Sequence, residues 1–107
     1  MVRRDNIPQE LYEDVKAYCQ IYWDDEATER KIRGLIATGM IYINGKLGGE
    51  MDYNKDGIHR QLLMDFVRYG RDNALDVFEN NYLSMIIGAQ LGGDDFGDLE
   101  DAEQDAE

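Results

Sequence analysis

Residues 62–91 constrain the fold more than any other stretch, because apolar side chains recur there at helical spacing for almost its whole length. The chain then continues as GGDDFGDLEDAEQDAE, residues 92–107, with eight carboxylates and no basic residue. The first stretch predicts packed helix, and the second predicts a disordered tail too polar to form a core of its own. A helical unit that ends abruptly at an acidic tail suggests a part for assembly.

Length and charge narrow the class of protein. The 107 residues fit one domain, which we place at 1–91, followed by a flexible acidic tail at 92–107. The formal net charge is −12, of which the tail carries −8 and the first 91 residues −4. We therefore expect no nucleic-acid binding through phosphate neutralisation, which needs clustered Lys and Arg. The single cysteine, Cys19, excludes an internal disulfide and suits a reducing compartment, and we expect neither a signal peptide nor a membrane span.

Two helices are expected in the first half of the chain. The first opens near Asn6 to Pro8, and its apolar face comprises Leu11, Val15, Tyr18, Cys19 and Tyr22. The second is expected over 26–44, with Gly45 as its C-cap. Glycines at 34 and 39 inside this helix suggest close backbone approach on two of its faces, since glycine otherwise weakens a helix. The alternative is that Gly34 is simply tolerated there.

The second half predicts one long helix and one short helix. The long helix begins near Gly57 or Ile58 and runs for about six turns to a break at Asn80-Asn81. Its continuous apolar stripe is Leu63, Phe66, Val67, Gly70, Ala74, Val77 and Phe78. A short helix over 82–90 follows. The expected class is all-α, a small bundle of about four helices with one long central helix.

No pattern in the chain predicts catalysis or a cofactor. The sequence Asp52 to Gly57 reads DYNKDG and begins like a calcium-binding loop, with Asp52, Asn54 and Asp56 as apparent ligands. However, the closing carboxylate position holds Leu63 and the ninth position holds Arg60, a cation. We therefore interpret this stretch as a plain Asx-rich turn and expect no metal.

A second set of small or apolar residues lies outside the expected core stripes. It comprises Gly34, Ala37 and Ile41 on the second helix and Met64 and Leu75 on the third, flanked by Arg30, Arg68 and Arg71. These strips are too small for another core but suit packing against a neighbouring subunit, which makes these eight residues candidates for a subunit interface. An ordinary solvated face remains the alternative.

Several runs of the sequence resemble one known family. Asp-Asp-Glu before a helix (residues 24–26), the run IRGLIATGMIYINGKLG and the run LLMDFVRYGRDNALDVFENNYLSMIIGAQ resemble the head–tail connector proteins of long-tailed bacteriophages and prophages. The likeness covers residues 8–91 and is a pattern of helix lengths and of aromatic and Asn positions. The chain departs from it at Gly39 and Gly70, where alanine is expected, and in its acidic tail.

The resemblance implies a ring of roughly a dozen subunits that binds beneath the portal protein after DNA packaging. Such a ring extends the DNA channel, lets packaged DNA pass without specific binding and offers a platform for the next head-completion or tail protein. The implied location is the head–tail interface of the virion, reached from the host cytoplasm. Candidate portal-docking residues are Ile87, Leu91, Phe96 and Leu99, and candidate residues for the channel lumen or the next protein are Lys46, Tyr53 and Lys55.

A different function class remains open. An acidic inhibitor that imitates DNA would block a nucleic-acid-processing protein, but it needs carboxylates at phosphate-like spacing on a rigid surface. Here most of the surplus negative charge lies in a glycine-punctuated tail. This arrangement favours the connector.

Overall fold

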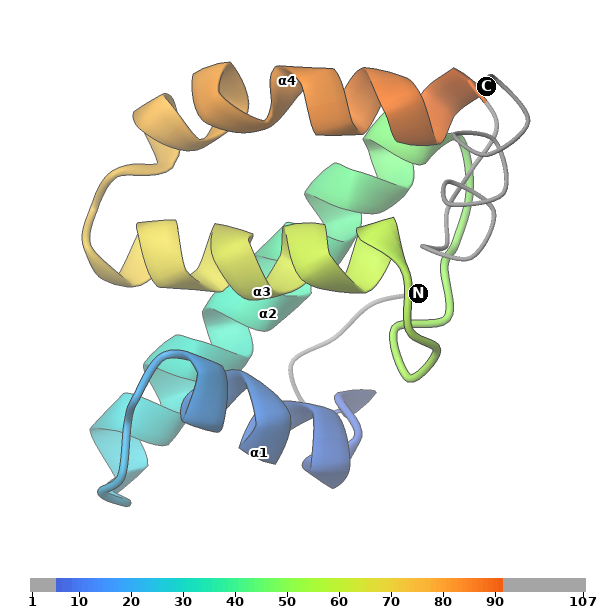
Figure 1. Ribbon diagram of the computed structural model, residues 1–107. Helices are drawn as coiled ribbons and strands as arrows, with labels where there is room; N and C mark the ends of the chain where they lie inside the picture. The colour runs from blue at the N-terminus through green and yellow to red at the C-terminus, as the bar shows by residue number, and fades with distance from the viewer. Residues whose placement is uncertain (1–5, 92–107) are drawn as a thin grey trace.

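The structure is a computed structural model that describes residues 6–91. Within that range the regular secondary structure consists of helices, joined by turns and loops. The helices are α1 (Gln9–Tyr18), α2 (Glu26–Leu47), α3 (Ile58–Arg71) and α4 (Leu75–Leu91). In Figure 1, α2 crosses behind α3, α1 lies below α3, and α4 lies above it. The all-α prediction is confirmed. The predicted tail, residues 92–107, lies outside the described residues.

Helix α1 is shorter than its apolar spacing predicts. Leu11 and Val15 are buried as expected, but the helix ends at Tyr18, and Gln20 takes a left-handed conformation with φ 60°. The chain turns there, so that Ile21 returns to the core while Tyr22 is 80% exposed. The assignment of Tyr22 to the apolar face was therefore wrong.

Helix α2 is the longest helix among the described residues, at 22 residues. Asp25 caps its start, since its carboxylate accepts the Thr28 backbone N–H at 2.7 Å. This hydrogen bond lowers the pKa of Asp25. The helix runs past the predicted end at Gly45 and stops at Leu47, because Gly48 supplies the left-handed residue with φ 86°.

Glycines set the distance at which α2 and α3 pack. A Cβ atom on Gly39 would lie 2.8 Å from Phe66 Cδ1 and 2.9 Å from Leu63 Cδ1. A Cβ on Gly70 would lie 2.7 Å from Leu35 Cδ2. The close approach predicted at Gly39 is confirmed, and both positions where the chain departs from the expected alanine are places where α2 and α3 meet.

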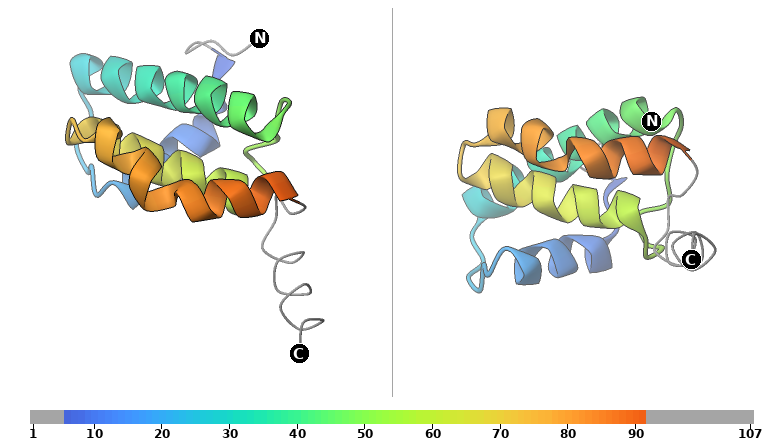
Figure 2. Two further views of the ribbon diagram at one scale, coloured as in Figure 1. Left: turned by 90° about the horizontal axis from the view of Figure 1, so that it is seen from above. Right: turned by 45° about the horizontal axis from the view of Figure 1, so that its top comes forward.

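The prediction of one long helix broken at Asn80-Asn81 was wrong. Asn73 has φ 59°, and the Ala74 backbone N–H donates to the Tyr69 carbonyl at 2.8 Å, which ends α3. The chain then reverses, and α4 runs back beside α3, straight through Asn80 and Asn81 (Figures 1 and 2). The long helix of this fold is therefore α2.

The reversal places an aromatic cluster between α2, α3 and α4. Phe78 is its centre, with ring centroids 5.4 Å from Phe66, 5.8 Å from Tyr69 and 4.9 Å from Tyr82. Tyr42 of α2 completes the cluster at 6.2 Å from Phe78. Val77, its neighbour in the predicted stripe, is 42% exposed because the stripe does not continue across the break.

Candidate functional site: a groove beside α2

An open groove of about 540 Å³ runs between the first half of α2 and the turn that joins α3 to α4. Residues 27–38 of α2 form one wall, and Gly70, Asn73 and Leu75 form the other. The lining residues, called the α2 groove below, are Ala27, Arg30, Lys31, Gly34, Leu35, Thr38, Gly70, Asn73 and Leu75.

The α2 groove combines positive charge with small and apolar side chains. Arg30 has a side chain 66% exposed, and its contact with Glu26 is long at 3.5 Å. Lys31 is exposed and forms no ion pair with a carboxylate among residues 6–91. Leu75 is 37% exposed, and no Asp or Glu is among the described residues that line the groove. An acidic partner with apolar side chains would match this lining.

The structure brings together three of the predicted interface residues from distant parts of the chain. Arg30, Gly34 and Leu75 all line the α2 groove. On the same helix as the first two, Ala37 is half-buried against the core and Ile41 is 60% exposed. The strip predicted on α2 is therefore only partly at the surface, because Ala37 packs against the core.

Met64 requires a correction. It is only 6% exposed and belongs to the core, so it cannot contribute to a surface strip with Leu75. The pairing of these two residues depended on a single helix through position 75. Because α3 ends at Arg71, Met64 and Leu75 lie on different helices.

The last two arginines of α3, Arg68 and Arg71, lie against aromatic side chains of α1, of α3 itself and of the loop that follows α1. Arg68 stacks over the rings of Tyr18 and Tyr69, at 5.8 and 5.7 Å from their centroids. Arg71 donates to the Cys19 carbonyl at 3.0 Å and lies 5.9 Å from the Trp23 ring. These contacts hold the arginines in place at the same end of the molecule as the groove, and neither lines it.

A buried carboxylate that sequence reasoning missed joins α1 to α3. Asp65 is 3% exposed, accepts a hydrogen bond from the Tyr18 hydroxyl and another from Gln61 Nε2 at 3.0 Å. Arg68 Nη2 lies 3.8 Å away. Burial, together with the Asp65 contact, raises the pKa of Tyr18. With its hydrogen bonds satisfied inside the protein, Asp65 has a structural role in this arrangement.

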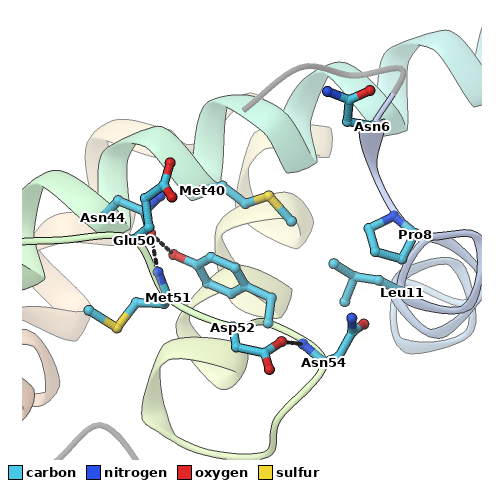
Figure 3. Close-up of a pocket in the computed structure, with 10 residues that line it drawn as sticks. Asn6, Pro8, Leu11, Met40, Asn44, Glu50, Met51, Asp52 and Asn54 are labelled. Atoms are coloured by element: carbon cyan, nitrogen blue, oxygen red, sulfur yellow. Dashed lines mark hydrogen bonds between the residues drawn. The ribbon is translucent and has the colours of Figure 1, made fainter. Parts of the chain in front are cut away.

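The loop over 48–57 encloses a smaller pocket of about 230 Å³ against α1 and α2 (Figure 3). Asn44 Oδ1 accepts from the Tyr53 hydroxyl at 2.7 Å and from the Met51 backbone N–H at 3.2 Å. Tyr53 is 5% exposed, and its burial raises its pKa. The prediction that Tyr53 contacts the channel lumen or the next protein was therefore wrong, because Tyr53 is a core residue. The other two candidates for that contact, Lys46 and Lys55, are exposed.

The apparent calcium ligands form the Asx turn that the sequence predicts. Asp52 Oδ1 accepts the Asn54 backbone N–H at 3.0 Å, and Asp56 lies 3.8 Å from Arg60 Nη1. His59 is buried, with Nε2 2.7 Å from the Asp52 carbonyl oxygen. Within residues 6–91 no three His, Cys, Asp or Glu side chains gather in a way that could hold a metal ion.

Helix α4 leaves an apolar stripe at the surface. Leu83, Ile87 and Leu91, spaced four apart, are 49%, 44% and 82% exposed, and we call them the α4 stripe. The stripe contains two of the candidate portal-docking residues and adds Leu83, which the sequence reasoning overlooked. The other two candidates, Phe96 and Leu99, lie outside the described residues.

Comparison of the chain with protein-family models, with curated proteins and with solved structures found no match. The assignment of function therefore depends on the sequence pattern and on the surfaces described above.

Chemistry at the remaining reactive groups is limited. Cys19 is buried, and burial raises the pKa of its thiol, which disfavours the nucleophilic thiolate.

None of the helices in the described part of the chain has the length and apolar content to cross a membrane.

Proposed function

We propose that this protein is a structural connector of a long-tailed bacteriophage or prophage, which forms a ring on the portal after DNA packaging and joins the head to the tail. The observation that supports it most is the α2 groove, where Arg30, Gly34 and Leu75 line one open surface. The resemblance of residues 8–91 to connector proteins supports the same proposal.

The groove suits a contact that repeats around a ring. A head-to-tail contact uses two different surfaces of one subunit, and it closes into a ring when the rotation between subunits allows it. The α2 groove is one such surface, with two cations beside small and apolar side chains. Its partner surface must be negative, and the chain as a whole carries a net charge of −12.

The same charge suits a protein that surrounds DNA without holding it. Binding to the DNA backbone needs a cluster of Lys and Arg that replaces the counterions of the phosphates. A ring with net negative subunits would instead repel the phosphates and let the DNA slide. The exposed α4 stripe is the proposed contact with the portal. The last turn of α2 at Lys46, with Lys55 in the loop that follows, is the proposed contact with the lumen or the next protein.

The test is to mix the protein with the portal protein of the same phage and measure the mass of the complex by sedimentation. We expect the wild-type chain to add a ring of roughly a dozen subunits to the portal. Thr38→Glu, which adds a negative and larger side chain on the exposed wall of the groove, should abolish the ring and leave the helical content unchanged. Ala17→Glu adds the same charge on an exposed part of α1 and should still assemble.

One result would overturn the connector proposal, and a second would overturn the role given to the α2 groove. A wild-type chain that forms no complex with the portal but binds tightly to a nucleic-acid-processing enzyme would indicate an acidic inhibitor. A Thr38→Glu chain that assembles as well as Ala17→Glu would exclude the α2 groove as the contact between subunits.

A further inference from the structure

We propose that the α2 groove of each subunit binds the acidic C-terminal segment, residues 92–107, of the next copy of this chain. The inference deepens the proposed function and rests on it, because it names what fills the groove between subunits. Three properties of residues 92–107 support this assignment: their charge, their position after α4 and the distance that they can span.

Charge complementarity is the first argument. Residues 92–107 hold eight carboxylates and no basic residue, whereas the described lining of the groove holds Arg30 and Lys31 and no carboxylate. Lys31 has no carboxylate partner among residues 6–91, and Arg30 has only the long exposed contact with Glu26. Both cations are therefore available to an acidic ligand at little cost.

The composition of the segment also fits the apolar part of the groove. Phe96 and Leu99 are three residues apart and are flanked by acidic residues on both sides. The present proposal assigns these two residues to the groove, in place of the portal contact that the family resemblance implied. The groove offers Leu35 and a 37% exposed Leu75 beside small residues such as Gly34. A bound segment could bury its two large apolar side chains there while its carboxylates reach the cations at the rim.

The position of the groove points to a second copy. Leu75 of the groove begins α4 and Leu91 ends it, so the acidic segment starts from the opposite end of a 17-residue helix, roughly 24 Å away at 1.5 Å per residue. Figure 1 shows the two ends of α4 on opposite sides of the molecule. The binding groove and the segment that would fill it thus lie at opposite ends of the subunit. This arrangement lets subunits join head to tail.

The segment is long enough for this contact. Its 16 residues can span up to roughly 50 Å when extended. That reach also allows the segment to fold back along α4 into the groove of its own subunit. The experiment must therefore separate binding between copies from binding within one copy.

A mixture of two isotopic forms of the full-length protein makes that separation. Equal amounts of ¹⁴N and ¹⁵N chains are treated with a carbodiimide, which joins a lysine amine to a carboxylate in direct contact. Mass spectrometry then identifies the joined peptides. The reaction is run at about 10 mM salt, where charges act over roughly 30 Å, and at about 1 M salt, where they act over roughly 3 Å.

We expect Lys31 of one isotope to be joined to carboxylates of residues 94–107 of the other isotope at low salt and not at high salt. Sedimentation at low salt should show self-association that Lys31→Glu weakens by roughly fivefold, since one exposed ion pair contributes at most about 1 kcal/mol. Lys55→Glu makes the same change of charge on an exposed loop residue outside the groove, and it should associate like the wild type.

Links only within one isotope would show that the segment occupies the groove of its own subunit and would overturn the proposal. Absence of links from Lys31 to the segment would overturn it as well, and so would equal weakening by Lys31→Glu and Lys55→Glu. Portal binding is measured separately on the same proteins. If the chain forms the ring on the portal without these links, the docking of the acidic segment is contradicted and the connector function is not. If the chain forms the links but does not bind the portal, the connector function is contradicted.

Discussion

At Gly39 the backbone of α2 lies so close to α3 that a methyl group has no free space. The atoms that a Cβ would meet belong to Phe66 and Leu63, which are buried side chains of the central core. Because both are held by their neighbours, Gly39→Ala should lower the free energy of unfolding by about 1–3 kcal/mol, the usual cost of overpacking.

Gly45 in the same helix is the matched control. No other part of the protein lies within 4 Å of a Cβ placed there, so Gly45→Ala should gain helix propensity, up to about 1 kcal/mol. Urea unfolding of both variants measures the difference. Equal stability of the two alanine variants would show that α2 and α3 do not cross at Gly39.

The tyrosines make stability sensitive to alkaline pH. Burial, and then the hydrogen bond to Glu79, raise the pKa of Tyr42 from 10.0 to about 12. Burial, and then the charge of Asp65, raise the pKa of Tyr82 to about 12. The folded protein thus favours the neutral phenols, and their contribution is complete below pH 10 and is lost as pH rises from 10 to 12.

We expect the urea midpoint to be constant from neutral pH to pH 9 and to fall between pH 10 and 12. Tyr42→Phe removes the ionisable group and should make this fall smaller. The fall should be unchanged in Tyr22→Phe, because the Tyr22 ring is 80% exposed. A stability profile that is flat up to pH 12 would contradict the half-buried, hydrogen-bonded position of Tyr42.

At the scale of the elements, the turn between α3 and α4 decides how the second half of the chain packs. The first backbone N–H groups of α4 have no partner within the helix, whereas those of Asn80 and Asn81 lie in its interior. Amide hydrogen exchange should therefore be fast at Leu75 and Asp76 and slow at Asn80 and Asn81. The reverse order would support a single helix that breaks at the asparagine pair.

Sequence patterns predicted the number and type of helices because each helix buries a stripe of apolar side chains. They misplaced the break because Asp72-Asn73 and Asn80-Asn81 carry similar local signals. What distinguishes them is tertiary: Asn73 takes the left-handed conformation, whereas Asn81 stays helical and donates to the Tyr69 hydroxyl at 3.0 Å. A stripe that continues across a reversal looks the same in the sequence as one long helix.

The missed turn at Asn73 also explains why only part of the candidate site was predicted. Arg30, Gly34 and Leu75 were identified from small and apolar residues outside the core stripes, but their meeting in one groove depends on the turn at Asn73. Met64 was included only because the turn was missed. Asp65 was overlooked because a carboxylate on a helix has the same spacing whether it faces solvent or lies buried against the tyrosine of another helix.

At the scale of the whole molecule, positive and negative surfaces are separated along the chain. Cations line the α2 groove beside the start of α4, and most of the surplus negative charge follows the end of α4. The acidic segment can reach these cations either on another copy of the chain or by folding back onto its own subunit. The proposed docking of the segment between subunits requires the first.

The most direct test of that claim is an electron microscopy map of the protein bound to its portal. We expect a closed ring in which the α2 groove of every subunit is covered by the neighbouring subunit, with the α4 stripe against the portal. A ring in which the groove faces solvent or the channel, with neighbours joined through other surfaces, would contradict this account.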